Sequence, residues 1–227
     1  MIPSLPSEPG TRVTDRPFRH VRYAAGSLID RAEGRQLTAE FPSLKLLHSE
    51  RRGHSKSYQV RVLPLHSAHG WQPDALGLLS PRWCAFAERL VTPKHLRSVC
   101  ELLGLTTRGV APDDLWVELR LAEYVAGGWM SRHTDRADKA FSQIFYFCPD
   151  WQPGWGGGLA LYDSEHAETP ATLIEPECGN AVAFARSDVS WHEVLPVSVQ
   201  ALASRRTLLV HAYYREPPLD SAPGAGS

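Results

Sequence analysis

Alternating apolar and polar residues dominate the second half of the chain. Five short runs are either apolar throughout or alternate with a period of two, and turns rich in Gly, Pro, Asp and Asn separate them: residues 115–124, 141–147, 159–162, 181–184 and 207–214. A period of two is typical of strands that bury one face. The pattern therefore predicts a β-structure of many short strands.

The first half follows a helical pattern instead. Apolar residues recur at helical spacing from Ser27 to Phe41, where Pro42 predicts a stop. Two further helices are predicted at residues 82–91 and 94–103. Each follows a hydroxyl residue and a proline, Ser80-Pro81 and Thr92-Pro93, and Gly104 ends the second one. Residues 49–78 are predicted to contain a strand or two within long loops.

Short strands after a helical layer indicate an α+β fold, with a barrel or jelly roll supported by helices on one side. The helical half alone has too few strands to close a core, so residues 21–215 are predicted to form a single domain with a β core at about 110–215. Four prolines in residues 1–20 predict an extended N-terminal arm, and the Pro-, Gly- and Ala-rich residues 216–227 predict a disordered tail.

Composition narrows the class of protein. Of 227 residues, 43% are hydrophobic and 22% charged, which is ordinary for a globular protein. A net charge of −1 gives no electrostatic basis for nucleic-acid binding. No window approaches the roughly 18 apolar residues of a membrane span. The four scattered cysteines are read as reduced thiols. We expect a cytoplasmic protein, a monomer or homodimer, with no nucleic-acid or membrane partner.

The candidate chemistry lies in two short segments of the β-rich half. His133 and Asp135 are two residues apart, so on a strand they would point to the same face. His192 lies in a loop that leads into a strand, and Arg205-Arg206 follows it. Two imidazoles and one carboxylate can occupy one face of an octahedral Fe(II) and leave positions for a chelating cosubstrate and O₂. An arginine fork suits the distal carboxylate of a dicarboxylic acid.

Five segments surround these residues in a fixed order: residues 123–135, where Tyr124 precedes His133 by nine positions with a Gly-Gly between them; 141–151, ending Asp-Trp; 154–162, with Trp-Gly-Gly-Gly-Leu; 179–194; and 204–208. Together they resemble prolyl-4-hydroxylase-like 2-oxoglutarate/Fe(II) oxygenases over about half of the chain. The resemblance implies a double-stranded β-helix (jelly-roll) core. It also implies the use of Fe(II), 2-oxoglutarate and O₂, with ascorbate as an accessory reductant.

The resemblance also implies roles for individual residues. His133, Asp135 and His192 would be the iron ligands and thus the catalytic centre. Arg205 would pair with the C5 carboxylate of 2-oxoglutarate, with the hydroxyl of Tyr146 beside it and Tyr124 near the same pocket. Arg206 is the alternative for the carboxylate role, and the family's usual Arg-x-small-hydrophobic order favours Arg205. The glycines 156–158 lack the helix and the Lys-Ser/Thr of a phosphate loop, so they are interpreted as a tight turn.

The resemblance leaves several substrate classes open as alternatives. A compact chain favours hydroxylation of a small-molecule or amino-acid-like substrate, and an intact Asp135 favours hydroxylation, desaturation or ring closure over halogenation. A peptide substrate, hydroxylated on a side chain such as proline, is the alternative. A third interpretation is a non-catalytic cupin-like barrel that holds Zn²⁺ or Mn²⁺. Residues of the first half would line the substrate pocket. Trp129 and Trp191 are candidate substrate contacts, and Arg51, Arg52 and Lys56 are either an anion site or a solvated charge run.

Overall fold

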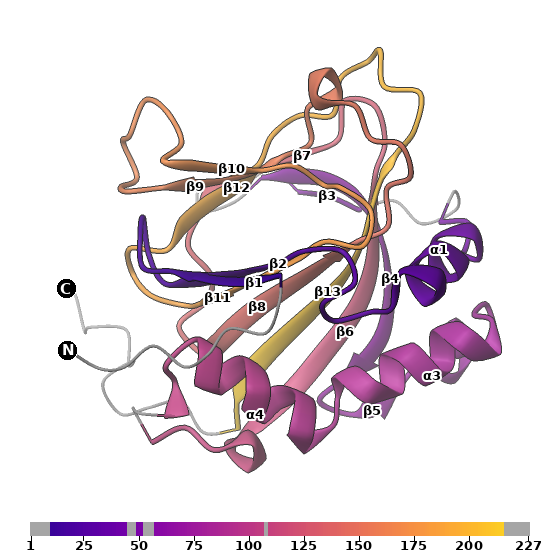
Figure 1. Cartoon of the computed structure of the whole chain (residues 1–227), viewed down its shortest axis with the longest axis vertical. Helices are drawn as coiled ribbons and strands as arrows, with labels where there is room; N and C mark the ends of the chain where they lie inside the picture. Colours follow the sequence, from indigo (N-terminus) through magenta and orange to yellow (C-terminus); the bar gives the residue numbers. More distant parts are fainter. Residues whose placement is uncertain (1–9, 45–48, 52–56, 107–108, 216–227) are drawn as a thin grey trace.

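The computed structural model describes residues 10–44, 49–51, 57–106 and 109–215 (Figure 1). Its helices are α1 (Arg31–Ala39), α2 (Pro73–Leu76), α3 (Pro81–Leu90) and α4 (Pro93–Leu102), with 3₁₀ turns at Pro112–Asp114 and Pro153–Trp155. Its strands are β1 (Thr11–Thr14), β2 (His20–Tyr23), β3 (Ser49–Arg51), β4 (Tyr58–Ser67), β5 (Gly70–Trp71), β6 (Leu115–Tyr124), β7 (Trp129–His133), β8 (Lys139–Tyr146), β9 (Leu159–Tyr162), β10 (Thr172–Ile174), β11 (Ala181–Ala185), β12 (Trp191–Val194) and β13 (Arg205–Tyr214).

The described strands form one antiparallel sheet that folds back over itself. Their order is β1-β2-β11-β8-β13-β6-β4-β7-β12-β9-β10, and β3 and β5 pair with β4. Strand β4 belongs to both halves, because Arg61–His66 pairs with β6 while Tyr58 and Gln59 pair with β7. Figure 1 shows the β7-β12-β9-β10 half facing the β2-β11-β8 half. This is the jelly-roll, or double-stranded β-helix, core of an α+β protein, which confirms the predicted fold class.

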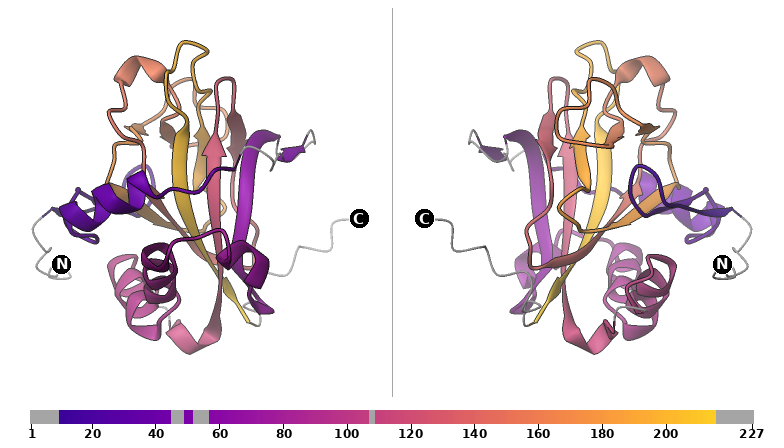
Figure 2. Two further views of the ribbon diagram at one scale, coloured as in Figure 1. Left: turned by 90° about the vertical axis from the view of Figure 1, so that its right-hand side faces the viewer. Right: turned by 90° about the vertical axis from the view of Figure 1, so that its left-hand side faces the viewer.

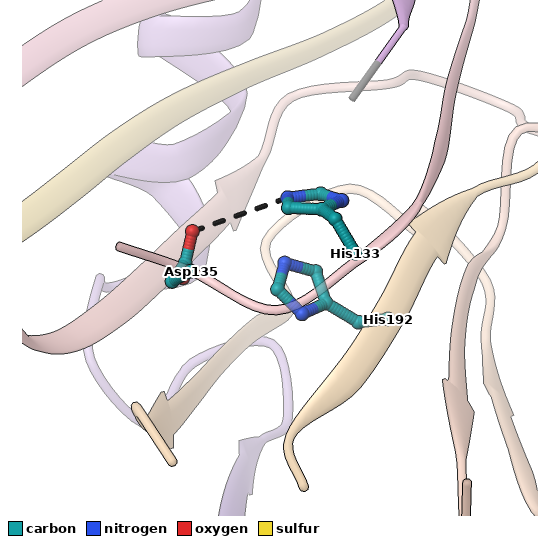
Figure 3. Close-up of side chains that lie close together, drawn as sticks. All are labelled: His133, Asp135 and His192. Atoms are coloured by element: carbon teal, nitrogen blue, oxygen red, sulfur yellow. Dashed lines mark ion pairs between the residues drawn. The ribbon is translucent and has the colours of Figure 1, made fainter. Parts of the chain in front are cut away.

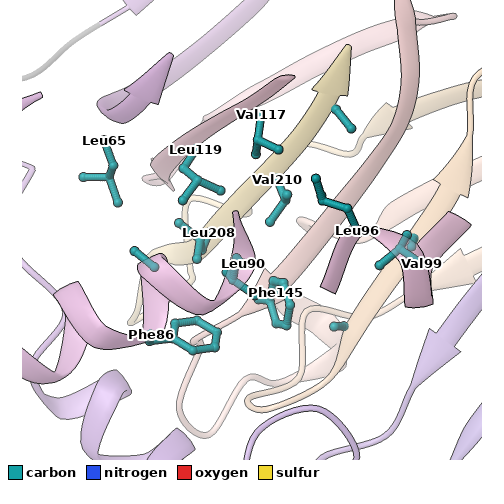
Figure 4. Packing of buried hydrophobic residues seen from close by; sticks show 14 of the residues in the cluster. Leu65, Phe86, Leu90, Leu96, Val99, Val117, Leu119, Phe145, Leu208 and Val210 are labelled. Carbon is teal, nitrogen blue, oxygen red and sulfur yellow. The ribbon is translucent and has the colours of Figure 1, made fainter. Parts of the chain in front are cut away.

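Helices α3 and α4 cover the outer face of the larger half, and Figure 2 shows the helices gathered on one side of the sheet. The two faces of β6 explain this packing. Leu119 and Leu121 belong to the core shared with the helices, whereas Arg120, Ala122 and Tyr124 line a cavity on the opposite face. Figure 4 shows Leu119 beside Val210 of β13, with Phe86 and Leu96 of the helices in the same cluster. The alternation in the sequence therefore separates a structural face from a functional one.

Truncation of a residue in this core tests the packing directly. Leu119 is 0% exposed, so Leu119→Ala is expected to lower the free energy of unfolding by about 2–5 kcal/mol, through lost apolar burial and the cavity left behind. Leu202 is 90% exposed, so Leu202→Ala should change it by less than about 0.5 kcal/mol. Urea-unfolding midpoints and slopes measure both effects. Equal losses for the two variants would contradict the assigned packing.

The capped helices match their sequence signals. Ser80 Oγ accepts from the Trp83 amide and Thr92 Oγ1 from the His95 amide, so the predicted caps are confirmed, and α3 and α4 begin one residue before the predicted ranges. The helix predicted from Ser27 to Phe41 is shorter, Arg31–Ala39. Asp30 is its N-cap, because the carboxylate accepts from the Ala32 and Glu33 amides. That prediction placed the start too early, since the apolar spacing extends beyond the residue that caps the helix.

Strands β6 and β9 match the predicted runs, and β13 begins two residues earlier than predicted. The N-terminal segment contributes more than expected to the sheet. Strand β1 lies within the predicted arm, and β2 begins at His20 and pairs with β11. Residues 1–9, the predicted tail 216–227, Arg52 and Lys56 lie outside the described residues.

Candidate metal centre and cosubstrate pocket

Three side chains from separate strands and loops converge inside the folded sheet (Figure 3). His133 ends β7 and His192 lies on β12, and the pairing of these strands places the two residues opposite each other with ring centroids 4.3 Å apart. Asp135 lies just after β7, with Oδ1 4.0 Å from His133 Nε2. One ligand atom from each residue lies within 4.8 Å of those of the other two. The chain thus brings together the three residues singled out in the sequence.

The backbone fixes the orientation of both imidazoles. His133 Nδ1 lies 2.7 Å from the carbonyl oxygen of Ser131, and His192 Nδ1 lies 2.9 Å from that of Ser190. A carbonyl only accepts, so each Nδ1 carries the proton and donates it. The lone pair of each neutral ring is then on Nε2, the atom that would meet a metal. This arrangement fits a divalent cation.

The carboxylate of Asp135 is also held in place. Lys139 Nζ donates to Oδ1 at 2.7 Å, and Ser142 Oγ donates to Oδ2 at 2.8 Å. Burial alone would raise the pKa of Asp135, but the adjacent Lys139 ammonium holds it well below its usual range. Asp135 is therefore a carboxylate in the folded protein, as a metal ligand must be.

Arg205 lines the same cavity and is 1% exposed. Its guanidinium carbon lies 4.9 Å from the ring centre of Tyr124 and 5.2 Å from that of Tyr146. The guanidinium Nε and Nη2 and the Tyr146 hydroxyl are buried without a hydrogen-bond partner among the described residues. Burial raises the pKa of Tyr146 to about 12, so its hydroxyl is protonated. Three buried polar groups thus surround a place suited to an anion.

Arg206 points to the other side of β13. It forms an ion pair with Glu123 at 3.5 Å, and its guanidinium lies 5.4 Å from the ring centre of Phe41. Among the two arginines, only Arg205 lines the cavity that contains the three metal-ligand candidates.

The glycine cluster after Trp155 makes room for Arg205. Gly157 has φ +69°, and a Cβ there would lie 3.3 Å from Arg205 Cδ and 3.1 Å from the Trp151 ring. Larger residues would be strained in this backbone conformation and would crowd the arginine. The interpretation as a tight turn with close packing is thus confirmed.

The cavity has a volume of about 180 Å³, and Met130 lines it whereas Trp129 and Trp191 do not. The predicted substrate contacts of the two tryptophans are therefore absent from this cavity. Sequence reasoning missed four polar residues in and around it: Arg120, Lys139, Ser142 and His211. Their signal was the presence of polar residues on strand faces otherwise apolar, such as Arg120, which shares a face with Tyr124.

Comparisons with known proteins show a family and a fold to which this chain is similar. Residues 119–214 match the 2OG-Fe(II) oxygenase superfamily. A crystal structure of a Pseudomonas putida prolyl-4-hydroxylase matches with a TM-score of 0.55 and 21% identity, over 86% of this chain and 92% of that one. A Trichoplax adhaerens prolyl hydroxylase in complex with a peptide fragment of hypoxia inducible factor matches with a TM-score of 0.50 and 14% identity, over 94% and 88%. A sequence comparison with curated proteins gives no match.

The match places residues 119–214, which contain the three metal-ligand candidates and Arg205, in the 2OG-Fe(II) oxygenase superfamily, whose members are 2-oxoglutarate-dependent dioxygenases that use Fe(II), 2-oxoglutarate and O₂. The set of metal-ligand candidates contains no cysteine, unlike the closed sets that structural zinc prefers. Among the described residues, no helix is both long and apolar enough to cross a membrane.

Proposed function

We propose that His133, Asp135 and His192 hold the ferrous ion. Two Nε2 lone pairs and one carboxylate oxygen, all from buried side chains, make a set of three that leaves further metal positions for other ligands. The carbonyl oxygens of Ser131 and Ser190 keep the imidazoles oriented, and Lys139 and Ser142 keep the carboxylate from rotating.

Arg205 is the proposed clamp for 2-oxoglutarate. Its buried N–H groups supply the donors that a C5 carboxylate requires, and the Tyr146 hydroxyl adds another. Tyr124 packs against the guanidinium and holds it in place. A buried charge without a partner is costly, so this end of the cavity favours an anionic ligand strongly.

The proposed activity is hydroxylation of an unactivated C–H bond in a small-molecule or amino-acid-like substrate. When bound, iron and 2-oxoglutarate activate O₂ for this oxidation, and the cosubstrate leaves as succinate and CO₂. The protein orients both substrates and keeps water from the reacting atoms. The observation that carries the proposal is that three metal-ligand candidates line one small cavity together with a buried arginine, two of whose nitrogens have no hydrogen-bond partner among the described residues.

Succinate release by the purified protein tests this proposal. Succinate should form from 2-oxoglutarate only when Fe(II) and O₂ are both present, and a suitable acceptor substrate should accelerate its formation. Zn²⁺ in place of Fe(II) should give none. Equal succinate formation with and without added Fe(II), after chelation of residual metal, would contradict the assignment.

A protein side chain, such as a prolyl residue, is the second candidate substrate. Two structures of similar fold are named prolyl hydroxylases, and one of them is in complex with a peptide. A screen of free amino acids against proline-containing peptides, read out as stimulated succinate release, separates the two classes. Stimulation by peptides alone would establish the second candidate.

Ser142 is expected to contribute to metal affinity through Asp135. Ser142→Ala removes the hydrogen bond to Oδ2 and should weaken Mn²⁺ binding about 10-fold, the usual effect of a lost partner of a metal ligand. Isothermal titration with Mn²⁺ measures it. Ser164→Ala, at an exposed position, is the matched control and should bind Mn²⁺ like the unmodified protein. Unchanged affinity in Ser142→Ala would argue against Asp135 as a ligand.

A further inference from the structure

A second arginine lines the cavity far from Arg205. Arg120 lies on β6, four residues before Tyr124 and on the same face, and Tyr124 is paired with Arg205. Four residues of strand span about 13 Å, so the two arginines stand toward opposite ends of the cavity. The Arg120 side chain is 29% exposed whereas Arg205 is 1% exposed. Arg120 therefore lies at the more exposed end of the cavity.

This end is next to the candidate metal centre. His211 of β13 lines the same part of the cavity and is paired in the sheet with Ser142, whose hydroxyl donates to Asp135. Leu209, two residues earlier on β13, is paired with Arg120. A molecule anchored by Arg120 would thus lie beside Asp135, on the side away from Arg205.

Arg120 uses only part of its hydrogen-bonding capacity. Its Nη2 donates to Glu118 Oε2, and its Nε is buried without a hydrogen-bond partner among the described residues. The same Oε2 also accepts from the Tyr213 hydroxyl at 3.1 Å and lies 3.4 Å from His211 Nδ1. A single carboxylate oxygen is thus shared by three donors. A guanidinium presents five N–H groups, so Arg120 can donate hydrogen bonds to a second carboxylate.

The neighbouring charges select the kind of anion. Burial opposes ionisation of Glu118, but contact with His211 and Arg120 keeps its pKa well below the usual range, so it is a carboxylate. Burial lowers the pKa of His211 to about 3, so this imidazole is neutral near pH 7. Of the groups in contact with Glu118, Arg120 alone is then a cation. A monoanion is accommodated beside Glu118 more easily than a doubly charged phosphate.

We propose that Arg120 binds a free carboxylate of the substrate, so that the enzyme acts on a small carboxylic acid, such as a free amino acid, rather than on a residue within a protein chain. This inference rests on the proposed function, because it places the acid in the cavity that holds the metal and 2-oxoglutarate. A prolyl residue within a peptide has no free carboxylate to offer at this position, because its carboxyl group is part of the peptide bond, whereas a free amino acid does.

The test compares butanoate with butanamide, two probes that differ in charge but hardly in shape. The protein is saturated with Mn²⁺ and 2-oxoglutarate, so the Arg205 end is filled and no turnover occurs, and each probe is titrated by calorimetry. Butanoate should bind at least about 10-fold more tightly than butanamide, as expected for a hydrogen bond to a charged group. Equal affinities, or binding of neither probe, would overturn the inference.

Two variants act in opposite directions. Arg120→Gln should remove the preference for butanoate. Glu118→Gln should strengthen butanoate binding, because the internal carboxylate that competes for Arg120 loses its charge. A purely structural Arg120–Glu118 pair predicts no gain in Glu118→Gln, and that result would overturn the inference even if Arg120→Gln failed to fold. Arg97→Gln, on the helical layer outside the cavity, is the matched control and should leave both affinities unchanged.

The preceding titration with 2-oxoglutarate separates the two proposals. If 2-oxoglutarate does not bind the Mn²⁺-loaded protein, the proposed function fails. If it binds and the two probes bind equally, only the carboxylate assignment fails.

Discussion

Asp135→Ala is expected to abolish the Fe(II)-dependent conversion of 2-oxoglutarate to succinate. Asp135 is the only carboxylate in the cluster of three candidate ligands in the described part of the chain. Its loss also leaves the buried Lys139 ammonium without its partner at 2.7 Å. Loss of a residue that hydrogen-bonds to a metal ligand typically lowers metal affinity or activity about 10–100-fold. Loss of the ligand itself should therefore lower the rate more than about 100-fold. Succinate formation at saturating Fe(II) measures the effect.

Asp163→Ala is the control for this experiment, because Asp163 is exposed and lies outside the cluster. It should retain the rate of the unmodified protein. Thermal unfolding of both variants checks that Asp135→Ala is folded. Substantial succinate formation by folded Asp135→Ala would show that Asp135 is not a metal ligand.

Arg205→Ala should raise the KM for 2-oxoglutarate by at least about 30-fold, because truncating one partner of a buried charge pair costs about 2–5 kcal/mol. The guanidinium is 1% exposed and two of its nitrogens have no hydrogen-bond partner among the described residues. Arg206→Ala is the matched control one position along the strand, where the side chain pairs with Glu123 outside the cavity.

Steady-state kinetics with varied 2-oxoglutarate separate the two arginines. The KM of Arg206→Ala should stay within about twofold of the unmodified value, since a change of less than about 0.5 kcal/mol is typical away from a site. A large increase of the KM in Arg206→Ala, with little change in Arg205→Ala, would assign the binding of the 2-oxoglutarate carboxylate to Arg206 instead of Arg205.

Local patterns in the sequence were sufficient for some of the elements and for naming the ligand candidates. The alternation of β6 separates Leu119 on the core face from Tyr124 on the cavity face, and the hydroxyl-proline pairs mark the starts of α3 and α4. These features depend on neighbours within a few residues. The resemblance to a known family then implied the role of each of these residues.

The remaining features depend on contacts between distant segments. Strand β4 joins the two halves of the sheet, although only a strand or two was predicted in its region. Glu118 and His211 are 93 residues apart, and their contact exists only because β6 and β13 pair in one register. No spacing in the sequence fixes that register, so the polar cluster around Arg120 became visible only in the folded chain.

The central claim is that three side chains bind Fe(II) in a way that leaves room for chelating 2-oxoglutarate. Anaerobic absorption spectroscopy tests it most directly, because a ferrous ion chelated by a 2-oxo acid has a charge-transfer band in the visible range. The band should appear when Fe(II) and 2-oxoglutarate are added together, and it should be absent with either one alone and in His192→Ala. Absence of the band in the unmodified, folded protein at saturating Fe(II) and 2-oxoglutarate would contradict the claim.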